Sequence, residues 1–249
     1  MSSFLFATDL DHTLVGDEAA LAELNQQLHR HRQENQTRIV YVTGRSLFRY
    51  RQLTQEQSLL PPDALITSVG TELYFDPTQD AFDANWAQIL SSEWDREQVV
   101  AIAGHFSDLT PQADSEQNPF KVSYFLSETV ADELIPRLES ALTEQNLSFK
   151  VIYSGGEDLD ILPAKGDKGL AIQFLRQKWK ISAEQTVVCG DSGNDIALFG
   201  GDERGVIVGN ARPELLQWYR ENCADHRYLA QASAAGGILE GLKHFGFLE

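Results

Sequence analysis

The stretch SSFLFATDLDHTLVGD, residues 2–17, begins with an apolar run and continues into two aspartates, Asp9 and Asp11. The run predicts a buried strand over Phe4–Thr8, because short apolar segments bounded by polar loops are typical of strands in a sheet covered on both faces. Aspartate is a poor strand residue, and two ionised carboxylates so close together repel each other. A group of opposite charge is therefore expected near the end of this strand.

The following elements continue an alternation of strands and helices. Residues 38–42, in TRIVYVTGRS, form a β-branched run that ends at Thr43 and Gly44, and helices are predicted over Glu18–Arg32 and Leu47–Gln57. Two more strand-like runs follow in DALITSVG and TELYFD. This alternation predicts a parallel sheet with helices on both faces, in which ligands bind beyond the carboxyl ends of the strands.

The segment from residue 80 to residue 163 departs from this pattern. Its helices are predicted over 84–93, 95–107 and 130–145, and its strands in FKVSYFL, FKVIYS and DLDILP. The last third returns to the α/β pattern, with a helix over 168–179, strands in TVVCGDSGND and GVIVGN, and helical segments at the end. We therefore predict an α/β protein: residues 1–79 and 164–249 form a Rossmann-like parallel-sheet core, and residues 80–163 form an inserted α+β cap.

The composition excludes several classes of partner. The 249 residues carry a formal net charge of −17, which repels nucleic acid and anionic membranes. No apolar run approaches the length of a membrane span, and the N-terminus lacks the features of a secretory signal. The two cysteines, Cys189 and Cys223, do not form a disulfide framework of the kind found in small secreted domains. We therefore expect a cytoplasmic protein, in which any anionic ligand needs local cations.

The stretch TVVCGDSGND repeats the opening arrangement, because an apolar strand again runs into two aspartates, Asp191 and Asp195. If both strands belong to one parallel sheet, these carboxylates converge with Asp9 and Asp11 at one edge. Oxygen ligands at this density suit Mg²⁺. Such an ion would offset the repulsion between the aspartates.

Other polar groups accompany the four carboxylates. Lys168, in KGDKG, opens a predicted helix, and Thr43 with the Gly44 N–H lies where a strand leads into a helix, a favourable site for an anion. Two carboxylates, a divalent metal, a lysine and a hydroxyl together suit phosphoryl transfer through an aspartyl-phosphate.

Each residue also has a plainer interpretation. An isolated aspartate in a loop is usually a turn or cap residue, and Thr43 alone can be a helix cap. Lys165 is expected to be solvated, and Cys189 to fill space in an apolar strand. The six histidines show no metal-ligand spacing and are expected to be structural or surface residues.

Four segments in this order, DLDHT, VTGR, DKG and GDSGND, resemble the motifs of the haloacid dehalogenase superfamily of phosphohydrolases. The resemblance implies that Asp9 is the nucleophile and that Asp11 is the general acid and base. It also implies that Thr43 and Lys168 bind the phosphoryl group. A cap inserted between the second and third motifs is a feature of one branch of this superfamily.

The same resemblance implies a magnesium site. Asp9, the Asp11 carbonyl and Asp191 would coordinate the ion, and Asp195 would support that shell. Two further loop residues are candidates for its surroundings: Ser192 and Asn194.

Over essentially its whole length, the chain resembles the sucrose-phosphate phosphatases. The stretches that carry this resemblance are TSVGTELY, EQNPFKVSYFL, SGGEDLDILP and GDSGNDIALF. Two departures, Thr71 in place of serine and Phe120 in place of tryptophan, leave the chemistry untouched but can alter sugar contacts. The implied reaction is hydrolysis of sucrose 6-phosphate to sucrose and phosphate, the last step of sucrose biosynthesis.

A disaccharide offers many hydroxyls and little apolar surface, so its site needs convergent polar side chains of fixed direction. EQNPFK, residues 116–121, supplies several such groups, with Pro119 stiffening the loop. The residues predicted to bind substrate are Thr43, Gly44, Arg45, Glu72, Gln117, Asn118, Lys121, Asp160 and Lys168.

Alternative functions remain open at this level. A phosphatase for another sugar phosphate, such as a mannosyl-glycerate or trehalose phosphate, would share the core. A phosphosugar mutase would need a phosphoenzyme that outlives attack by water. A non-catalytic module that binds a sucrose-phosphate synthase is disfavoured because Asp9 and Asp11 are both present. Association of an active enzyme with that synthase remains open.

Overall fold

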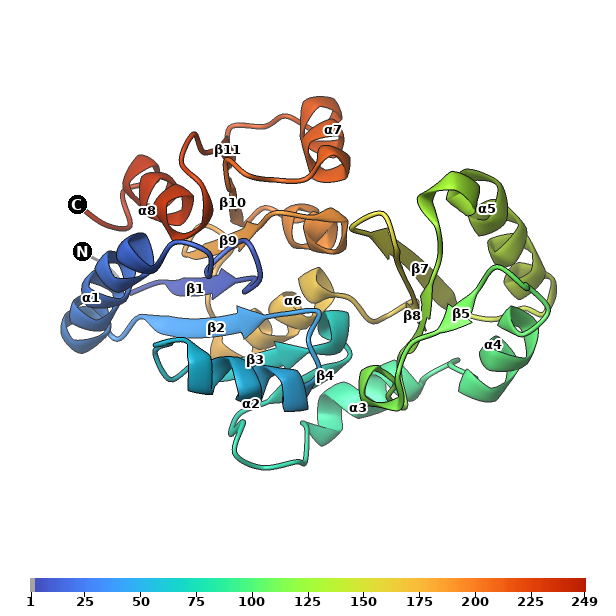
Figure 1. Ribbon diagram of the computed structural model, residues 1–249. Coiled ribbons are helices and arrows are strands. Elements are labelled where there is room, and N and C mark those ends of the chain that lie inside the picture. Colours follow the sequence, from blue (N-terminus) through green and yellow to red (C-terminus); the bar gives the residue numbers. More distant parts are fainter. Residues whose placement is uncertain (1–2) are drawn as a thin grey trace.

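The computed structural model describes residues 3–249, so the first two residues of the predicted core lie outside it. Figure 1 shows two lobes, each built around its own sheet. Both chain ends lie on the larger lobe, beside α1 (Glu18–Asn35) and α8 (Ala234–His244). This arrangement confirms the predicted fold class, an α/β core with an α+β insertion.

The larger sheet has seven strands in the order β11-β10-β9-β1-β2-β3-β4. They are β1 (Leu5–Thr8), β2 (Arg38–Val42), β3 (Ala64–Thr67), β4 (Glu72–Tyr74), β9 (Thr186–Gly190), β10 (Arg204–Ile207) and β11 (Arg227–Leu229). Thr8 of β1 is in register with Tyr41 of β2 and Cys189 of β9, and all three strands run parallel. The residues that follow these strands therefore meet at one edge of the sheet.

Helices cover both faces of this sheet, as predicted. On one face α1, α8 and α2 (Leu47–Glu56) pack against side chains such as Phe6. On the other face α3 (Ala84–Ser91), α6 (Lys168–Trp179) and α7 (Pro213–Glu221) pack against the alternate side chains, such as Ala7. Because successive side chains of a strand point to opposite faces, the central strands are buried on both sides.

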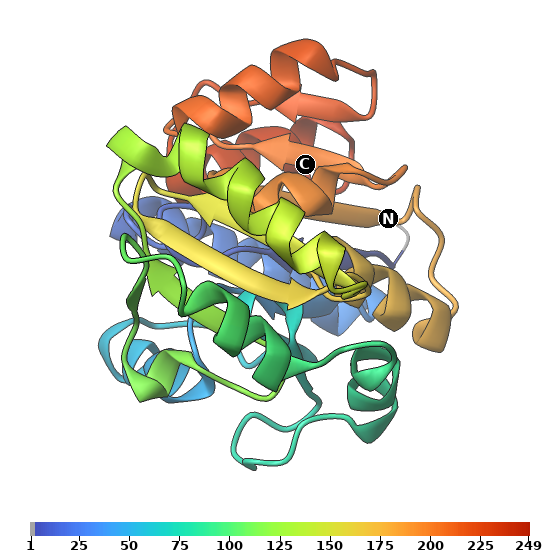
Figure 2. The same ribbon diagram turned by 90° about the vertical axis from the view of Figure 1, so that its right-hand side faces the viewer.

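The smaller sheet has four antiparallel strands in the order β5-β6-β8-β7. They are β5 (Thr110–Pro111), β6 (Val122–Phe125), β7 (Phe149–Ser154) and β8 (Asp158–Pro163). The helices α4 (Arg96–Ala103) and α5 (Glu128–Glu144) cover one face and form a separate apolar core with it, as Figure 2 shows from that side. The other face is turned toward the larger lobe (Figure 1).

In the smaller lobe, α4 ends four residues before the predicted 107, and β5 lies where no strand was predicted. Three features of the larger lobe also differ from what the sequence predicted. Residues 227–229 form β11, where only helical segments were expected, because this three-residue edge strand is largely half-exposed and has no apolar run to indicate it. β4 returns antiparallel to β3 through the turn at Ser68–Gly70, so the sheet is not parallel throughout. The loop in GDSGND closes into a 3-10 helix, η3 (Gly193–Phe199), in which Ser192 and Asp195 form a capping box.

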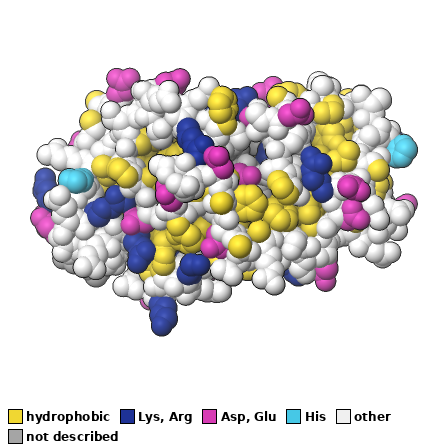
Figure 3. Space-filling model, turned by 90° about the horizontal axis from the view of Figure 1, so that it is seen from below, with side chains coloured by type: hydrophobic (Ala, Val, Ile, Leu, Met, Phe, Trp, Pro, Cys, Tyr) yellow, Lys and Arg dark blue, Asp and Glu magenta, His cyan; other side chains and the backbone are white. Residues whose placement is uncertain are grey.

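The surface mixes apolar and charged groups. On the face seen from below, apolar side chains gather toward the middle, among charged ones (Figure 3). Exposed apolar residues include Phe75, just after β4, and Ile89 of α3. Among residues 3–249, no helix is long and apolar enough to cross a membrane.

Candidate active site

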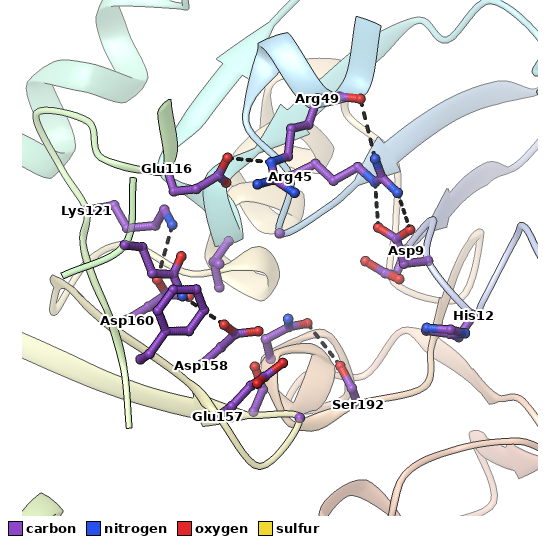
Figure 4. Close-up of a pocket in the computed structure, with 18 of the residues that line it drawn as sticks. Asp9, His12, Arg45, Arg49, Glu116, Lys121, Glu157, Asp158, Asp160 and Ser192 are labelled. Atoms are coloured by element: carbon purple, nitrogen blue, oxygen red, sulfur yellow. Dashed lines mark hydrogen bonds and ion pairs between the residues drawn. The ribbon is translucent and has the colours of Figure 1, made fainter. Parts of the chain in front are cut away.

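A cavity of about 450 Å³ lies between the carboxyl edge of the larger sheet and the smaller lobe (Figure 4). The larger lobe lines it with Asp9, Asp11, His12, Gly44, Arg45, Arg49, Val69, Asp191, Ser192, Asn194 and Arg212. The smaller lobe lines it with Gln112, Ala113, Glu116, Lys121, Phe125, Ser154, Gly155, Glu157, Asp158 and Asp160. Both lobes therefore build the site.

Lys168 lies behind the cavity wall, fully buried at the start of α6. Its Nζ donates to Asp9 Oδ1 at 2.7 Å and to Asp195 Oδ1 at 2.6 Å. The helix begins here because the Asp167 side chain accepts a hydrogen bond from the Leu170 N–H at 2.7 Å and so caps the first turn. The structure thus brings the predicted lysine to the predicted nucleophile.

Asp195 organises the loop that carries Asp191. Its Oδ2 accepts the N–H of Asp191 at 3.0 Å and that of Ser192 at 3.1 Å, while its Oδ1 accepts from Lys168. Gly190 is required for this close approach, because a Cβ there would lie 2.5 Å from the Asp195 Cβ. Both carboxylate oxygens of Asp195 are engaged with protein groups, which suits the supporting role predicted for it.

The acidic site is short of positive charge. Burial raises the pKa of Asp9 well above its usual range, and the charges of Asp195 and Asp191 add to this while Lys168 opposes it. Burial, together with the Asp195 charge, also raises the pKa of Asp191 to about 6, against a hydrogen bond from Thr13. Burial alone would lower the pKa of Lys168, but the neighbouring carboxylates raise it, so the lysine stays charged.

The three buried carboxylates lie close enough to share a cation. One oxygen from each of Asp9, Asp191 and Asp195 lies within 4.8 Å of the others. A divalent cation that prefers oxygen ligands fits this donor set. The cluster contains no histidine, and it is the one such group among the described residues.

Thr43 and Gly44 form the turn from β2 into α2. Thr43 is fully buried, and its Oγ1 accepts the Arg45 N–H at 3.1 Å. Gly44 lines the cavity, whereas Thr43 does not. The backbone of this turn therefore reaches the site, and the Thr43 hydroxyl holds the turn in shape.

Two arginines extend from this turn and helix into the cavity (Figure 4). Arg45 donates from Nε to Asp11 Oδ2 and from Nη2 to Asp11 Oδ1, both at 2.7 Å, so this ion pair is bidentate. The hydrogen bonding to Asp11 raises the pKa of the Arg45 guanidinium. Arg49 Nε donates to Glu116 Oε1 at 2.6 Å and so joins α2 to the smaller lobe.

The smaller lobe contributes a buried polar cluster to the cavity. Lys121 Nζ donates to Ser123 Oγ at 2.5 Å and to Asp160 Oδ1 at 3.1 Å. The exposed fractions of Lys121 and Asp160 are only 3% and 6%, yet both residues line the cavity. The structure thus brings two of the predicted substrate-binding residues to the cavity in fixed orientations.

Three other residues predicted to bind substrate do not line the cavity: Glu72, Gln117 and Asn118. The Glu72 carboxylate accepts from Thr67 Oγ1 at 2.8 Å. Gln117 Nε2 donates to the Ser123 carbonyl at 2.8 Å, and Asn118 Nδ2 donates to Thr71 Oγ1 at 2.9 Å. Because these groups are bonded to protein, they shape the backbone behind the wall, and the structure gives no support to their predicted sugar contacts.

Phe125 lies on the cavity wall with an exposed fraction of 46% and was not among the residues predicted to bind substrate. This position could have been predicted, because Lys121, Ser123 and Phe125 alternate along FKVSYFL with Val122 and Tyr124, which pack in the apolar core of the smaller lobe. Side chains two apart share one face of a strand. The remaining wall residues, such as Arg49, carry no comparable signal, because their positions depend on how distant segments pack.

Two residues, Lys165 and Cys189, have the non-functional positions that the sequence predicted. Lys165 lies on the surface and bonds through Nζ to Ser92 Oγ at 3.0 Å. Cys189 is a free, buried cysteine in β9. His12 is exposed as expected, but it also lines the cavity.

The chain is similar to known proteins over nearly its whole length. The profile of the sucrose-6F-phosphate phosphohydrolase family matches residues 2–246. The crystal structure of the sucrose-phosphatase from Synechocystis sp. PCC6803, in complex with sucrose and phosphate, shares 43% identity and superposes with a TM-score of 0.93 over 99% of each chain.

Two curated relatives differ in length. Probable sucrose-phosphatase 2 of Arabidopsis thaliana is 39% identical over 97% of this chain, which spans only 59% of the relative's length. The mannosylfructose-phosphate phosphatase of Agrobacterium fabrum is 34% identical, and the match covers 97% of this chain and 96% of the relative's length.

Proposed function

Because the chain belongs to the sucrose-6F-phosphate phosphohydrolase family, within the haloacid dehalogenase superfamily, we propose that it is a Mg²⁺-dependent phosphatase that hydrolyses sucrose 6-phosphate to sucrose and phosphate. The observation that carries this proposal is the position of the Asp9 carboxylate. It lies in the wall of a two-lobed cavity, bonded to a buried lysine and facing polar groups of the smaller lobe. This geometry supports attack by a carboxylate on a phosphoryl group whose sugar is held from the other side.

The reaction proceeds in two displacements. In the first, an Asp9 oxygen attacks phosphorus, the bond from phosphorus to the sugar oxygen breaks, and Asp11 gives its proton to the leaving oxygen. In the second, Asp11 removes a proton from water, the water oxygen attacks phosphorus, and the bond from phosphorus to Asp9 breaks. Lys168 holds Asp9 in position in both steps.

The donor set fits a magnesium ion, because burial raises the pKa values of Asp9 and Asp191 and a divalent cation that prefers oxygen ligands would keep both carboxylates ionised. We propose that these two carboxylates and the Asp11 carbonyl hold the ion. Asp195 supports their loop, since both of its oxygens are already engaged. When bound, Mg²⁺ neutralises charge that develops on the phosphoryl oxygens.

The smaller lobe holds the sugar in this proposal. Lys121 and Asp160 face the cavity with fixed directions, and both can bond to hydroxyls. Gly44 and Arg45 face the phosphoryl group from the opposite wall. A site that pairs each hydroxyl with a buried polar group discriminates strongly against analogues that lack that hydroxyl.

Mannosylfructose phosphate is a second candidate substrate, because a relative of matching length is named for it. Sucrose and mannosylfructose differ in the hexose joined to fructose, so contacts to that hexose decide between them. The alternatives that the sequence left open also remain: hydrolysis of trehalose phosphate, hydrolysis of a mannosyl-glycerate phosphate, and a phosphosugar mutase reaction. Association with a sucrose-phosphate synthase and a cytoplasmic location stay predictions.

Phosphate release from a panel of sugar phosphates in Mg²⁺ tests the proposal. Sucrose 6-phosphate should give a higher kcat/KM than mannosylfructose phosphate, trehalose 6-phosphate or p-nitrophenyl phosphate. A higher value for mannosylfructose phosphate would select the second candidate. Formation of an isomeric sugar phosphate would indicate a mutase, and the absence of any phosphate release would refute the assignment as a hydrolase.

A further inference from the structure

Arg45 is paired with a carboxylate that the proposed reaction also needs. Its guanidinium donates two hydrogen bonds of 2.7 Å to Asp11, one to each carboxylate oxygen. Figure 4 shows Arg45 extending along the cavity wall. Because Arg45 engages both Asp11 oxygens, the arginine must let go before this carboxylate can pass a proton to a leaving group.

The ion pair of Arg45 differs from that of Lys168 in its exposure. Lys168 is fully buried between Asp9 and Asp195, so its partners are fixed. The exposed fractions of the Arg45 and Asp11 side chains are 28% and 40%, and both lie in the cavity. Solvent reaches this pair, so an incoming anion can compete for the guanidinium without breaking a buried contact.

We infer that Arg45 exchanges partners when substrate binds, an inference that rests on the proposed function. In the free protein, the arginine holds Asp11 beside α2. When the phosphoryl group arrives, the guanidinium passes from Asp11 to two phosphoryl oxygens, and the Asp11 side chain is released toward the leaving oxygen. Two hydrogen bonds break and two form, and no covalent bond changes. Arg45 is therefore a positioning residue that links the arrival of the anion to the availability of Asp11.

The chemistry of arginine suits this exchange. Its planar fork matches the geometry of a carboxylate and of a phosphoryl group equally well. A phosphoryl monoester carries about −1.5 to −2 charges near neutral pH, more than a carboxylate, so the exchange favours the substrate. A lysine would attract the anion but lacks the fork that holds Asp11. Since the chain has a net charge of −17, a local cation must attract the anion against the overall field.

Crystal structures of the unmodified protein with Mg²⁺, without and with inorganic phosphate, test the exchange directly. Without phosphate, Arg45 should pair with Asp11. With phosphate in the cavity, Arg45 should bond to phosphate oxygens, and the Asp11 carboxylate should have left the guanidinium. Phosphate bound beside an intact pair would overturn the inference alone. If inorganic phosphate does not bind near Asp9 at all, the proposed function fails together with the inference.

Kinetics of Arg45→Gln and Arg45→Lys give a second test, with Arg51→Gln as a control of equal charge change. Arg51 lies on α2, six residues beyond Arg45, but pairs with Asp80, outside the cavity. Arg45→Gln should raise KM for sucrose 6-phosphate by about tenfold to a hundredfold, as expected for a lost charged hydrogen-bonding group, while kcat changes by less than about threefold.

Arg45→Lys should raise KM less than Arg45→Gln does, and Arg51→Gln should have the KM and kcat of the unmodified protein. If Arg45→Gln instead lowers kcat strongly at an unchanged KM, Arg45 stays on Asp11 during the chemical step, and the exchange is wrong. If the variants do not fold, the pair of crystal structures decides.

Discussion

At the scale of single residues, the candidate site is governed by a balance of charge. Asp9, Asp191 and Asp195 are buried together, and Lys168 is the lysine that contacts two of them. Buried carboxylates without enough cations are unstable as ions, which is why their pKa values rise. Substitutions here should therefore change activity and stability in opposite directions.

Asp9→Asn tests the nucleophile. Asparagine keeps the shape of the side chain but removes the attacking oxygen and one negative charge. Phosphate release should fall by at least about a thousandfold, as it does when other covalent nucleophiles are removed. A variant that is folded, has not deamidated and keeps more than about a tenth of the activity would contradict the covalent mechanism.

Asp191→Asn tests the electrostatic balance through stability. Without metal, the pKa of Asp191 is about 6 in the folded protein against an ordinary value of 3.8. At pH values between about 4 and about 6, the folded protein therefore binds more protons than the unfolded chain. Its free energy of unfolding falls as the pH rises through this range and stays low above it. The asparagine variant lacks this penalty.

Thermal unfolding of the metal-free proteins gives the measurement. Asp191→Asn should raise Tm by a few degrees near pH 7.5 and by much less near pH 4.5. Adding Mg²⁺ near pH 7.5 should raise the Tm of the unmodified protein but not that of the variant. The exposed Asp202→Asn serves as a control and should show neither effect. An equal gain at both pH values would point to packing instead of charge.

At the scale of elements, the contact of η3 with β7 holds the two lobes together at the edge of the cavity. Glu214, in the first turn of α7, accepts the N–H of Gly193 in η3 and that of Gly155 in the turn after β7, both at 3.3 Å. Gly193 also lies against β7, because a Cβ on it would be 2.9 Å from the Tyr153 carbonyl oxygen. The absence of a side chain at this position lets the smaller lobe sit against the acidic loop.

Gly193→Val should push β7 away from the acidic loop. Since the cavity is built by both lobes, a displacement on the order of 1 Å should lower kcat/KM for sucrose 6-phosphate by about tenfold or more. Gly200→Ala, at the end of the same 3-10 helix, is the matched control, because its Cβ would make an ordinary contact of 3.6 Å with Ala197 O. Equal kinetics for both variants would show that the lobes do not depend on this close contact.

At the scale of the whole molecule, the two lobes divide the work. The larger lobe holds the aspartates proposed to carry out the phosphoryl transfer and the turn that faces the phosphoryl group. The smaller lobe holds the polar cluster around Lys121. An aryl phosphate can use the first set but offers no sugar hydroxyls to the second. Comparing two substrates therefore separates the two lobes.

Lys121→Gln should lower kcat/KM for sucrose 6-phosphate by about tenfold to a hundredfold, because this is the effect expected when a hydrogen bond from a charged group is lost. Glutamine is preferred over alanine because it leaves the buried Asp160 a hydrogen-bond donor. The value for p-nitrophenyl phosphate should hardly change, and the exposed Lys165→Gln should affect neither substrate. Equal losses on both substrates would assign Lys121 to the phosphoryl site or to the fold.

The sequence by itself determined the α/β core and the order of its catalytic motifs. The strand before Asp9, the helix that opens at Lys168 and the strand before Asp191 follow from local signals: apolar runs, a capping aspartate and β-branched residues. Parallel pairing of these strands then brings their ends to one edge without further information.

Only the tertiary structure decided which polar side chains of residues 116–121 face the cavity. Lys121 does so, whereas Asn118 is held by Thr71, which lies 47 positions away in the sequence. The pairing of Arg45 with Asp11, 34 positions apart, was equally beyond the sequence. The physical reason is that a local pattern sets how a strand or helix forms, while the direction of a loop side chain depends on which distant group completes its hydrogen bonds.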